Sequence, residues 1–225
     1  MVLFCWLAPL LLTACGGFGL DTRGGLDDSR QVSDSDADSD ADSDADSDAD
    51  SGPRAGTVAA LGRGDLVITE VMQDPASVTD AKGEWFEVWN ASGASVDLEG
   101  LVVTDVDSDV FTVLSALNVP TDGFVVFARN ADEASNGSIG ADYGYSGMDL
   151  ANSTDEIQLW NGTLLLDEVV WDGGPVFPNA AGVAMALDPR RMDVDLNDAG
   201  GSWCAARGRY GAGDLGSPGS ANGPC

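Results

Sequence analysis

Residues 84–90 read EWFEVWN. In an extended chain, successive side chains point to opposite faces, so Trp85, Glu87 and Trp89 would share one face and the two residues between them the other. Aromatic and β-branched residues favour strands, whereas Asn90 favours a turn. The stretch therefore predicts a short strand that ends at Asn90.

Similar short runs, separated by Gly, Asn, Asp and Pro, recur on both sides of this strand. They lie at residues 66–72, 98–104, 110–114, 124–128, 157–160, 164–171 and 183–187. Asn161-Gly162 predicts a hairpin with a type I′ turn, which needs positive φ at both central residues. No window has the period of a long amphipathic helix. Eight or nine strands without helices predict an all-β sandwich or barrel.

The most specific stretches are EWFEVWN, followed by VDLEG at 96–100, and the ending GSPGSAN at 216–222. Others are LVITEVMQDP at 66–75, VPTDGFVVFARN at 119–130, LANSTDEIQLWNGTLLLDEVVW at 150–171 and VAMALDP at 183–189. In these stretches the chain resembles the lamin tail domain, a module of nuclear lamins and of bacterial surface proteins. The resemblance implies an immunoglobulin-like β-sandwich that serves as an accessory or binding module without catalytic residues.

Composition excludes several classes of function. The 225 residues include 38 Asp and Glu against 10 Lys and Arg, a net charge of −28, and no His. Such a chain repels nucleic acid, and it cannot form a Ser-His-Asp triad, a Cys-His dyad or a His-containing zinc site. No apolar run reaches the roughly 18 residues that a membrane span needs. We therefore expect a protein that is not an enzyme and has no nucleic-acid partner.

Residues 1–14 are apolar, uncharged and end in small residues, which is typical of an export signal. The tetrad that ends at Cys15 resembles a bacterial lipobox, which implies cleavage before Cys15 and lipidation of this residue. The segment lacks the usual Lys or Arg, so the true start could also lie upstream. Gly16 favours the outer over the inner membrane. The predicted location is the bacterial cell envelope, with the membrane as partner through the lipid.

Residues 15–64 form a predicted disordered linker, and residues 65–225 the predicted domain. From Asp34 to Asp50 the linker reads DSDADSDADSDADSDAD. It has few apolar side chains to bury, and its repeated charges keep it extended. We expect this linker to act as an acidic spacer between the membrane and the domain.

The domain contains two cysteines, Cys204 and Cys225. An even pair in an exported protein suggests a disulfide, with two free thiols as the alternative. The disulfide would connect the C-terminal tail to the segment around Trp203.

Two Asp-rich stretches resemble the first half of a calcium loop. Their candidate ligands are Asp105, Asp107 and Asp109 in one stretch, and Asp193, Asp195 and Asn197 in the other. Neither has the Gly and Glu that the full EF-hand motif requires. Each is therefore interpreted as an acidic turn, with a calcium site of another kind as the alternative. No other cofactor is predicted.

Acidic pairs and tryptophans offer weaker signals. On a strand, the two side chains of an acidic pair would point in different directions in Glu84 with Glu87 and in Asp167 with Glu168. Neither pair therefore fits an acid–base site. Trp85, Trp89, Trp160 and Trp171 are spread over separate strands and predict core packing, or a surface that binds glycan or peptide.

The leading hypothesis is a non-enzymatic, lipid-anchored envelope protein that presents a binding module to a protein or glycan. The alternatives are a calcium-dependent adhesion or structural module and a carboxylate–metal hydrolase.

Overall fold

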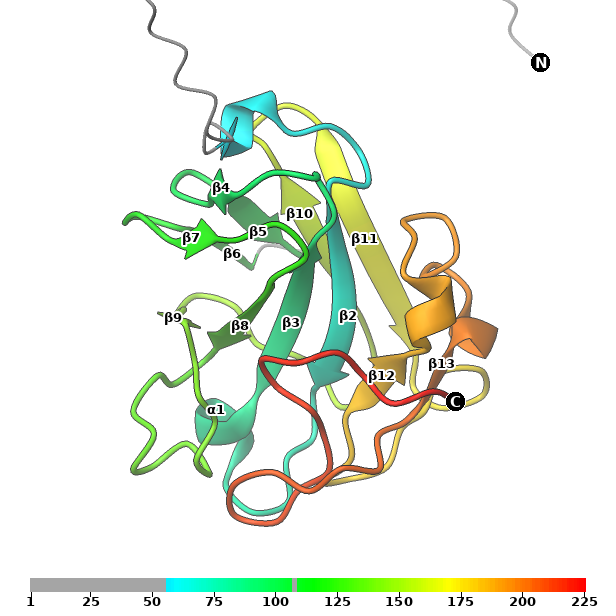
Figure 1. Ribbon diagram of the computed structural model, residues 1–225. Helices are drawn as coiled ribbons and strands as arrows, with labels where there is room; N and C mark the ends of the chain where they lie inside the picture. Colours follow the sequence, from blue (N-terminus) through cyan, green and yellow to red (C-terminus); the bar gives the residue numbers. More distant parts are fainter. Residues whose placement is uncertain (1–55, 107–108) are drawn as a thin grey trace, which may run out of the picture. The chain divides into compact units, whose positions relative to one another are not determined.

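The computed structural model describes residues 56–106 and 109–225, and over these it is a β-sandwich (Figure 1). The predicted signal, Cys15, most of the predicted linker and Asp107 lie outside the described residues. A six-stranded sheet has the order β13 (Trp203–Ala205), β12 (Met185–Leu187), β2 (Leu66–Met72), β3 (Trp85–Asn90), β8 (Phe124–Ala128) and β9 (Tyr143–Gly144). A four-stranded sheet has the order β11 (Leu165–Asp172), β10 (Thr154–Trp160), β5 (Val102–Thr104) and β6 (Val110–Thr112).

Smaller elements complete the described fold. A three-stranded sheet has the order β1 (Gly56–Thr57), β4 (Val96–Asp97) and β7 (Asn118–Val119). The helical turns are α1 (Asp80–Gly83), η1 (Val58–Ala60), η2 (Pro189–Arg191) and η3 (Gly200–Ser202). The all-β, immunoglobulin-like sandwich expected from the sequence is confirmed.

Aromatic side chains fill the space between the two larger sheets. The rings of Phe86 on β3 and Phe127 on β8 stack with centroids 5.0 Å apart. Phe111 on β6, from the opposite sheet, lies 6.4 Å from Phe86 and 6.0 Å from Phe127. Burial of such large apolar side chains is the main favourable term in folding, and here it joins the two layers.

The folded unit begins before residue 65, where composition places the boundary. Gly56 on β1 pairs with Val96 on β4, and Val58 and Leu61 are buried in the core. The apolar run VAAL at 58–61 is too short to give a periodic signal, so sequence reasoning assigned it to the linker.

The predicted hairpin between β10 and β11 forms, but the prediction of a type I′ turn is wrong. The loop is Asn161–Leu164, and the Asn161 N–H donates to the Leu164 carbonyl over 3.1 Å. Gly162 has a φ of 101°, whereas Asn161 is not among the residues with positive φ. Instead, the Asn161 side-chain Oδ1 accepts the Leu164 N–H over 2.8 Å, so this side chain closes the loop.

Several predicted strands are shorter than their apolar runs. Leu98 and Leu101 are buried but precede β5, and Leu114 lies beyond β6 with 79% of its surface exposed. The short strands β1, β4, β7, β9 and β13 lack the alternating pattern that would reveal them. The single turn of α1 is likewise too short to give a helical period.

Candidate functional site

The outward surface of the four-stranded sheet places a Trp ring beside a row of polar side chains. The residues on either side of Gln158 are buried, so Gln158 and Trp160 point away from the core. Strand pairing sets Gln158 between Thr104 on β5 and Glu168 on β11. We call this surface the β10 face, and it consists of Val102, Thr104, Val110, Gln158, Trp160, Glu168 and Val170.

Hydrogen bonds hold the polar row of the β10 face in one arrangement. Gln158 Oε1 accepts hydrogen bonds from Thr104 Oγ1 and Trp160 Nε1, each over 3.2 Å. Gln158 Nε2 donates to Glu168 Oε2. A hollow of about 340 Å³ lies beside Trp160. A fixed row beside an accessible ring reduces the entropy that a partner would lose on binding.

Exposed apolar side chains flank this polar row. Val110 on β6 and Val170 on β11 are each 50% exposed, and Leu164 in the hairpin loop is 44% exposed. Apolar side chains gathered on one surface mark interaction sites more often than scattered ones do. Among the predicted tryptophans, Trp85 and Trp171 are in the core, whereas Trp160 is partly exposed.

A second feature, the acidic hollow, lies near one end of the β10 face and has a volume of about 470 Å³. Its charged lining consists of Asp80, Glu84, Asp105, Asp109, Arg129, Asp149 and Asp155. Arg129 bridges two acids, with Nη1 3.1 Å from Glu84 Oε2 and Nη2 2.5 Å from Asp149 Oδ1. Burial raises the pKa of Glu84 to about 7, against the opposing effects of the Leu150 N–H and Arg129.

The first predicted calcium set is partly placed in the acidic hollow. Asp105 and Asp109 both line it, and Asp105 Oδ1 accepts the Asp109 N–H over 2.9 Å. Asp109 Oδ2 accepts the Asp149 N–H over 3.1 Å. Within residues 56–106 and 109–225, no group of three or more His, Cys, Asp or Glu side chains is placed to hold a metal ion. Calcium binding by this set stays a prediction, because Asp107 is outside the described residues.

The second predicted set has three different environments. Asp193 Oδ1 accepts the Asp195 and Leu196 N–H groups, as in the acidic turn that the sequence predicts. Asp195 Oδ1 lies 2.6 Å from Arg63 Nη1. Asn197 is buried, and its Nδ2 donates to Asp167 Oδ2 over 2.8 Å. The structure therefore gives these side chains partners within the protein instead of bringing them together around an ion.

Sequence reasoning considered three of the following four acids only as acid–base pairs and did not predict that their carboxyl groups are buried. Glu70, Glu84, Glu87 and Asp167 are each at most 2% exposed. Burial raises the pKa of Glu87 and Asp167 to about 7, and burial together with the charge of Glu87 raises that of Glu70 to about 8. The signal was available for Glu70, because it lies inside the apolar run LVITEVM, whose residues are all buried.

Two of these acids bind the C-terminal strap, which we define as residues 216–225. The Ser217 N–H donates to Glu70 Oε1 over 3.0 Å, and the Gly219 N–H donates to Glu87 Oε2 over 2.8 Å. In Figure 1 the strap crosses β2 and β3, as these contacts require. Within the described residues, the strap has no neighbouring strand at these positions to accept its backbone hydrogen bonds. Buried carboxyl groups accept them instead.

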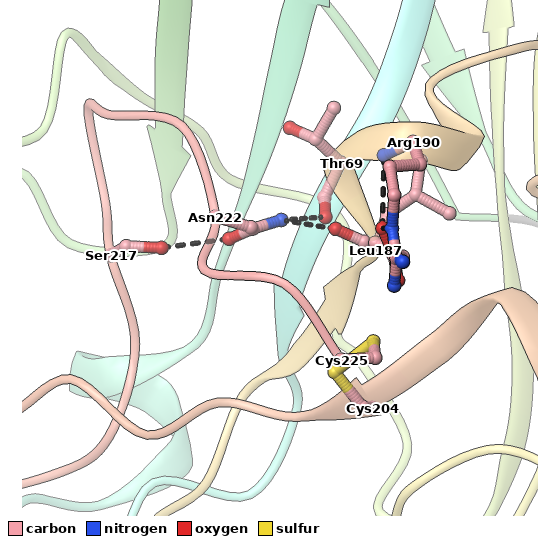
Figure 2. The surroundings of a disulfide bond; sticks show 8 residues. Thr69, Leu187, Arg190, Cys204, Ser217, Asn222 and Cys225 are labelled. Atoms are coloured by element: carbon pink, nitrogen blue, oxygen red, sulfur yellow. Dashed lines mark hydrogen bonds and ion pairs between the residues drawn. A yellow bond between two sulfur atoms is a disulfide. The ribbon is translucent and has the colours of Figure 1, made fainter.

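A side-chain amide and a disulfide hold the rest of the strap (Figure 2). Asn222 Nδ2 donates to the carbonyls of Thr69 and Leu187 over 2.7 and 3.2 Å, and its Oδ1 accepts from Ser217 Oγ. Beyond it, Cys225 is joined to Cys204 on β13, with Cα atoms 5.7 Å apart. This is the pairing expected from the number of cysteines.

Comparison with known proteins agrees with the fold. The Lamin Tail Domain family model matches residues 60–173, just over half of the chain. No curated protein and no solved structure matches the chain. In the described part of the chain, no helix has the length and apolar character needed to cross a membrane. From the family match and the sandwich topology, the chain belongs to the lamin tail domain family.

Proposed function

We propose that this protein is a lipid-anchored component of the cell envelope that presents its lamin tail domain as a non-enzymatic binding module. The family points to a binding or structural role. The observation that carries the proposal is the β10 face, where a hydrogen-bonded polar row lies beside Trp160 and between exposed valines. The partner is a protein or glycan at the cell surface.

The chemistry of the β10 face supports binding. Trp160 offers an apolar ring with a polar N–H that Gln158 already occupies, so the ring can contact a partner without leaving a donor unsatisfied. Glu168 keeps further acceptor positions for hydroxyl or amide donors, because Gln158 Nε2 uses only one lone pair of its carboxylate. With a net charge of −28 on the chain, nucleic acid is a poor partner.

Lipidation of Cys15 would place this face outside the cytoplasm. The acidic repeat between Asp34 and Asp50 would keep the domain away from anionic lipid headgroups through charge repulsion. Metabolic labelling with a palmitate analogue tests the anchor. We expect label in the natural chain and in Cys5→Ala, which alters the signal peptide only, and loss of label in Cys15→Ala. Label that persists in Cys15→Ala would refute the anchor.

Site-specific cross-linking in cells tests the binding face. A photo-reactive amino acid at Val170 on β11 should capture a partner, whereas the same group at the exposed Glu133, in the loop between β8 and β9, should not. Trp160→Ala should reduce capture from Val170 while far-UV circular dichroism stays unchanged. Equal capture from both positions, or capture that Trp160→Ala leaves intact, would contradict a role for the β10 face.

A further inference from the structure

The strands that carry the β10 face contain acidic but no basic side chains. Asp and Glu occur on β10 and β11, and neither Lys nor Arg occurs on β5, β6, β10 or β11. Glu156 lies two residues before Gln158, and Glu168 two residues before Val170, so both acids share the outward side of the sheet. This surface therefore attracts cationic partners and repels anionic ones.

The polar row of the β10 face uses most of its own donors. The Thr104 hydroxyl and the Trp160 N–H both donate to Gln158 Oε1. Gln158 Nε2 gives one of its hydrogens to Glu168, whose carboxylate keeps further lone pairs. A partner therefore meets mainly hydrogen-bond acceptors, which suits a group that only donates.

The hollow beside Trp160 has the lining that a long cationic side chain needs. Its walls are Val102, Thr104, Asp105, Trp160 and Gly162, and its volume is about 340 Å³. An aliphatic stem can pack on Val102 and the indole ring, while the charged head lies near the Asp105 carboxylate.

Exposed apolar side chains extend the surface beyond the hollow. Val110 and Val170 are each 50% exposed and lie on the two outer strands of the sheet, β6 and β11. They offer contacts to apolar side chains and no hydrogen bonds. A partner that covers the whole face therefore combines cationic with apolar groups.

We propose that the partner of the β10 face is a protein segment in which lysine or arginine lies beside apolar residues, and that one cationic side chain enters the hollow between Trp160 and Asp105. This inference rests on the proposed function, because it identifies the partner of the same face. Lysine and arginine have donors and no acceptor, which matches the acceptors of the row. Complementary charge also favours this partner over acidic competitors.

A glycan fits this surface less well. A sugar hydroxyl is both donor and acceptor, whereas the donors of Thr104 and Trp160 are already used within the row. The exposed valines would leave sugar hydroxyls without partners. An acidic glycan would also be repelled by Glu156 and Glu168.

Nuclear magnetic resonance titrations of the full chain test this inference with defined probes. The probes are a peptide of alternating lysine and valine, the same peptide with glutamate in place of lysine, and the neutral oligosaccharide maltohexaose. Each is added at about 0.15 M salt to screen diffuse attraction. The indole N–H signal of Trp160 reports on the face directly, because this group donates to Gln158 in the row. We expect only the lysine peptide to shift it.

Matched variants separate this face from the general acidity of the domain. Asp105→Asn with Glu168→Gln should weaken binding of the lysine peptide about fivefold, because two charges that face the cation are lost while each amide keeps an oxygen acceptor. Asp122→Asn with Glu133→Gln removes the same charge from exposed loops next to β8 and should change binding less than twofold.

Three results would overturn the inference. They are no shift of the Trp160 signal with the lysine peptide, equal loss of binding in the two double variants, and a shift with maltohexaose or the glutamate peptide that exceeds the shift with the lysine peptide. Cross-linking from Val170 in cells does not depend on the charge of the partner. Capture there, together with any of these three results, would leave the β10 face as a binding surface and reject only the cationic partner.

Discussion

The backbone N–H of Gly219 donates to the buried carboxylate of Glu87 over 2.8 Å. This bond joins the two stretches of sequence that best identify the family, EWFEVWN and GSPGSAN. The strap is therefore part of the sandwich, although it lies beyond the residues 60–173 that the family model matches.

We expect Glu87→Ala to lower the free energy of unfolding by about 2–4 kcal/mol, because it leaves the Gly219 N–H without its acceptor and removes the nearer of the two acceptors of the Thr69 hydroxyl. Glu87→Gln keeps an acceptor and should cost about 1 kcal/mol or less. Urea denaturation measures both, with Glu133→Ala as an exposed control. If the free energy of unfolding of Glu87→Ala equals that of Glu133→Ala, the strap does not depend on the Glu87 carboxylate.

Reduction of the Cys204–Cys225 disulfide should destabilise the domain. The disulfide closes a loop of about 20 residues, which contributes roughly 3 kcal/mol through the entropy of the unfolded chain. We expect a fall in Tm of about 6–12 °C in reductant, and no effect of reductant on the double variant Cys204→Ser with Cys225→Ser. Two titratable thiols in the unreduced, exported protein would show that the disulfide is absent.

The β-branched and aromatic runs that form β2, β3, β8, β10 and β11 predicted an all-β sandwich or barrel, and the family resemblance implied the sandwich. Outside the apolar run that contains Glu70, the sequence could not reveal how the acids divide between core and surface. Glu87 and Glu133 are chemically identical, and only tertiary contacts bury one under the strap and expose the other.

Gly211 should be the least replaceable of the tail glycines. Its φ is +41°, and a Cβ there would lie 1.9 Å from the Gly137 carbonyl oxygen, a backbone atom that cannot rotate away. Gly211→Ala should therefore cost about 2–4 kcal/mol. Gly201→Ala is the control, since nothing lies within 4 Å of a Cβ at that position. Similar melting temperatures for the two variants would show that the Gly211 loop adjusts freely.

The stability of the domain should fall as the pH rises through neutrality. Burial raises the pKa of Glu84, Glu87 and Asp167 to about 7, and that of Glu70 to about 8. Unfolded carboxyls titrate near pH 4, so the folded domain holds protons that the unfolded chain has released. The stabilisation that these bound protons give the folded domain is complete below about pH 4 and is lost as the pH passes about 7 to 8. We expect calorimetry to give a Tm several degrees higher at about pH 5 than at about pH 8.5.

Asp167 and Asn197 give the sharpest test of this protonation. Asp167 Oδ2 accepts the Ile68 N–H over 2.7 Å and Asn197 Nδ2 over 2.8 Å. The Oδ1 atoms of both side chains are buried without a hydrogen-bond partner among the described residues, and a proton on Asp167 would supply a donor there. Asp167→Asn carries a permanent donor instead, so it should raise the Tm at about pH 8.5 and reduce the pH dependence. Asp167→Leu should lower the Tm at both pH values. If Asp167→Asn lowers the Tm as much as Asp167→Leu does, Asp167 is ionised in the folded domain.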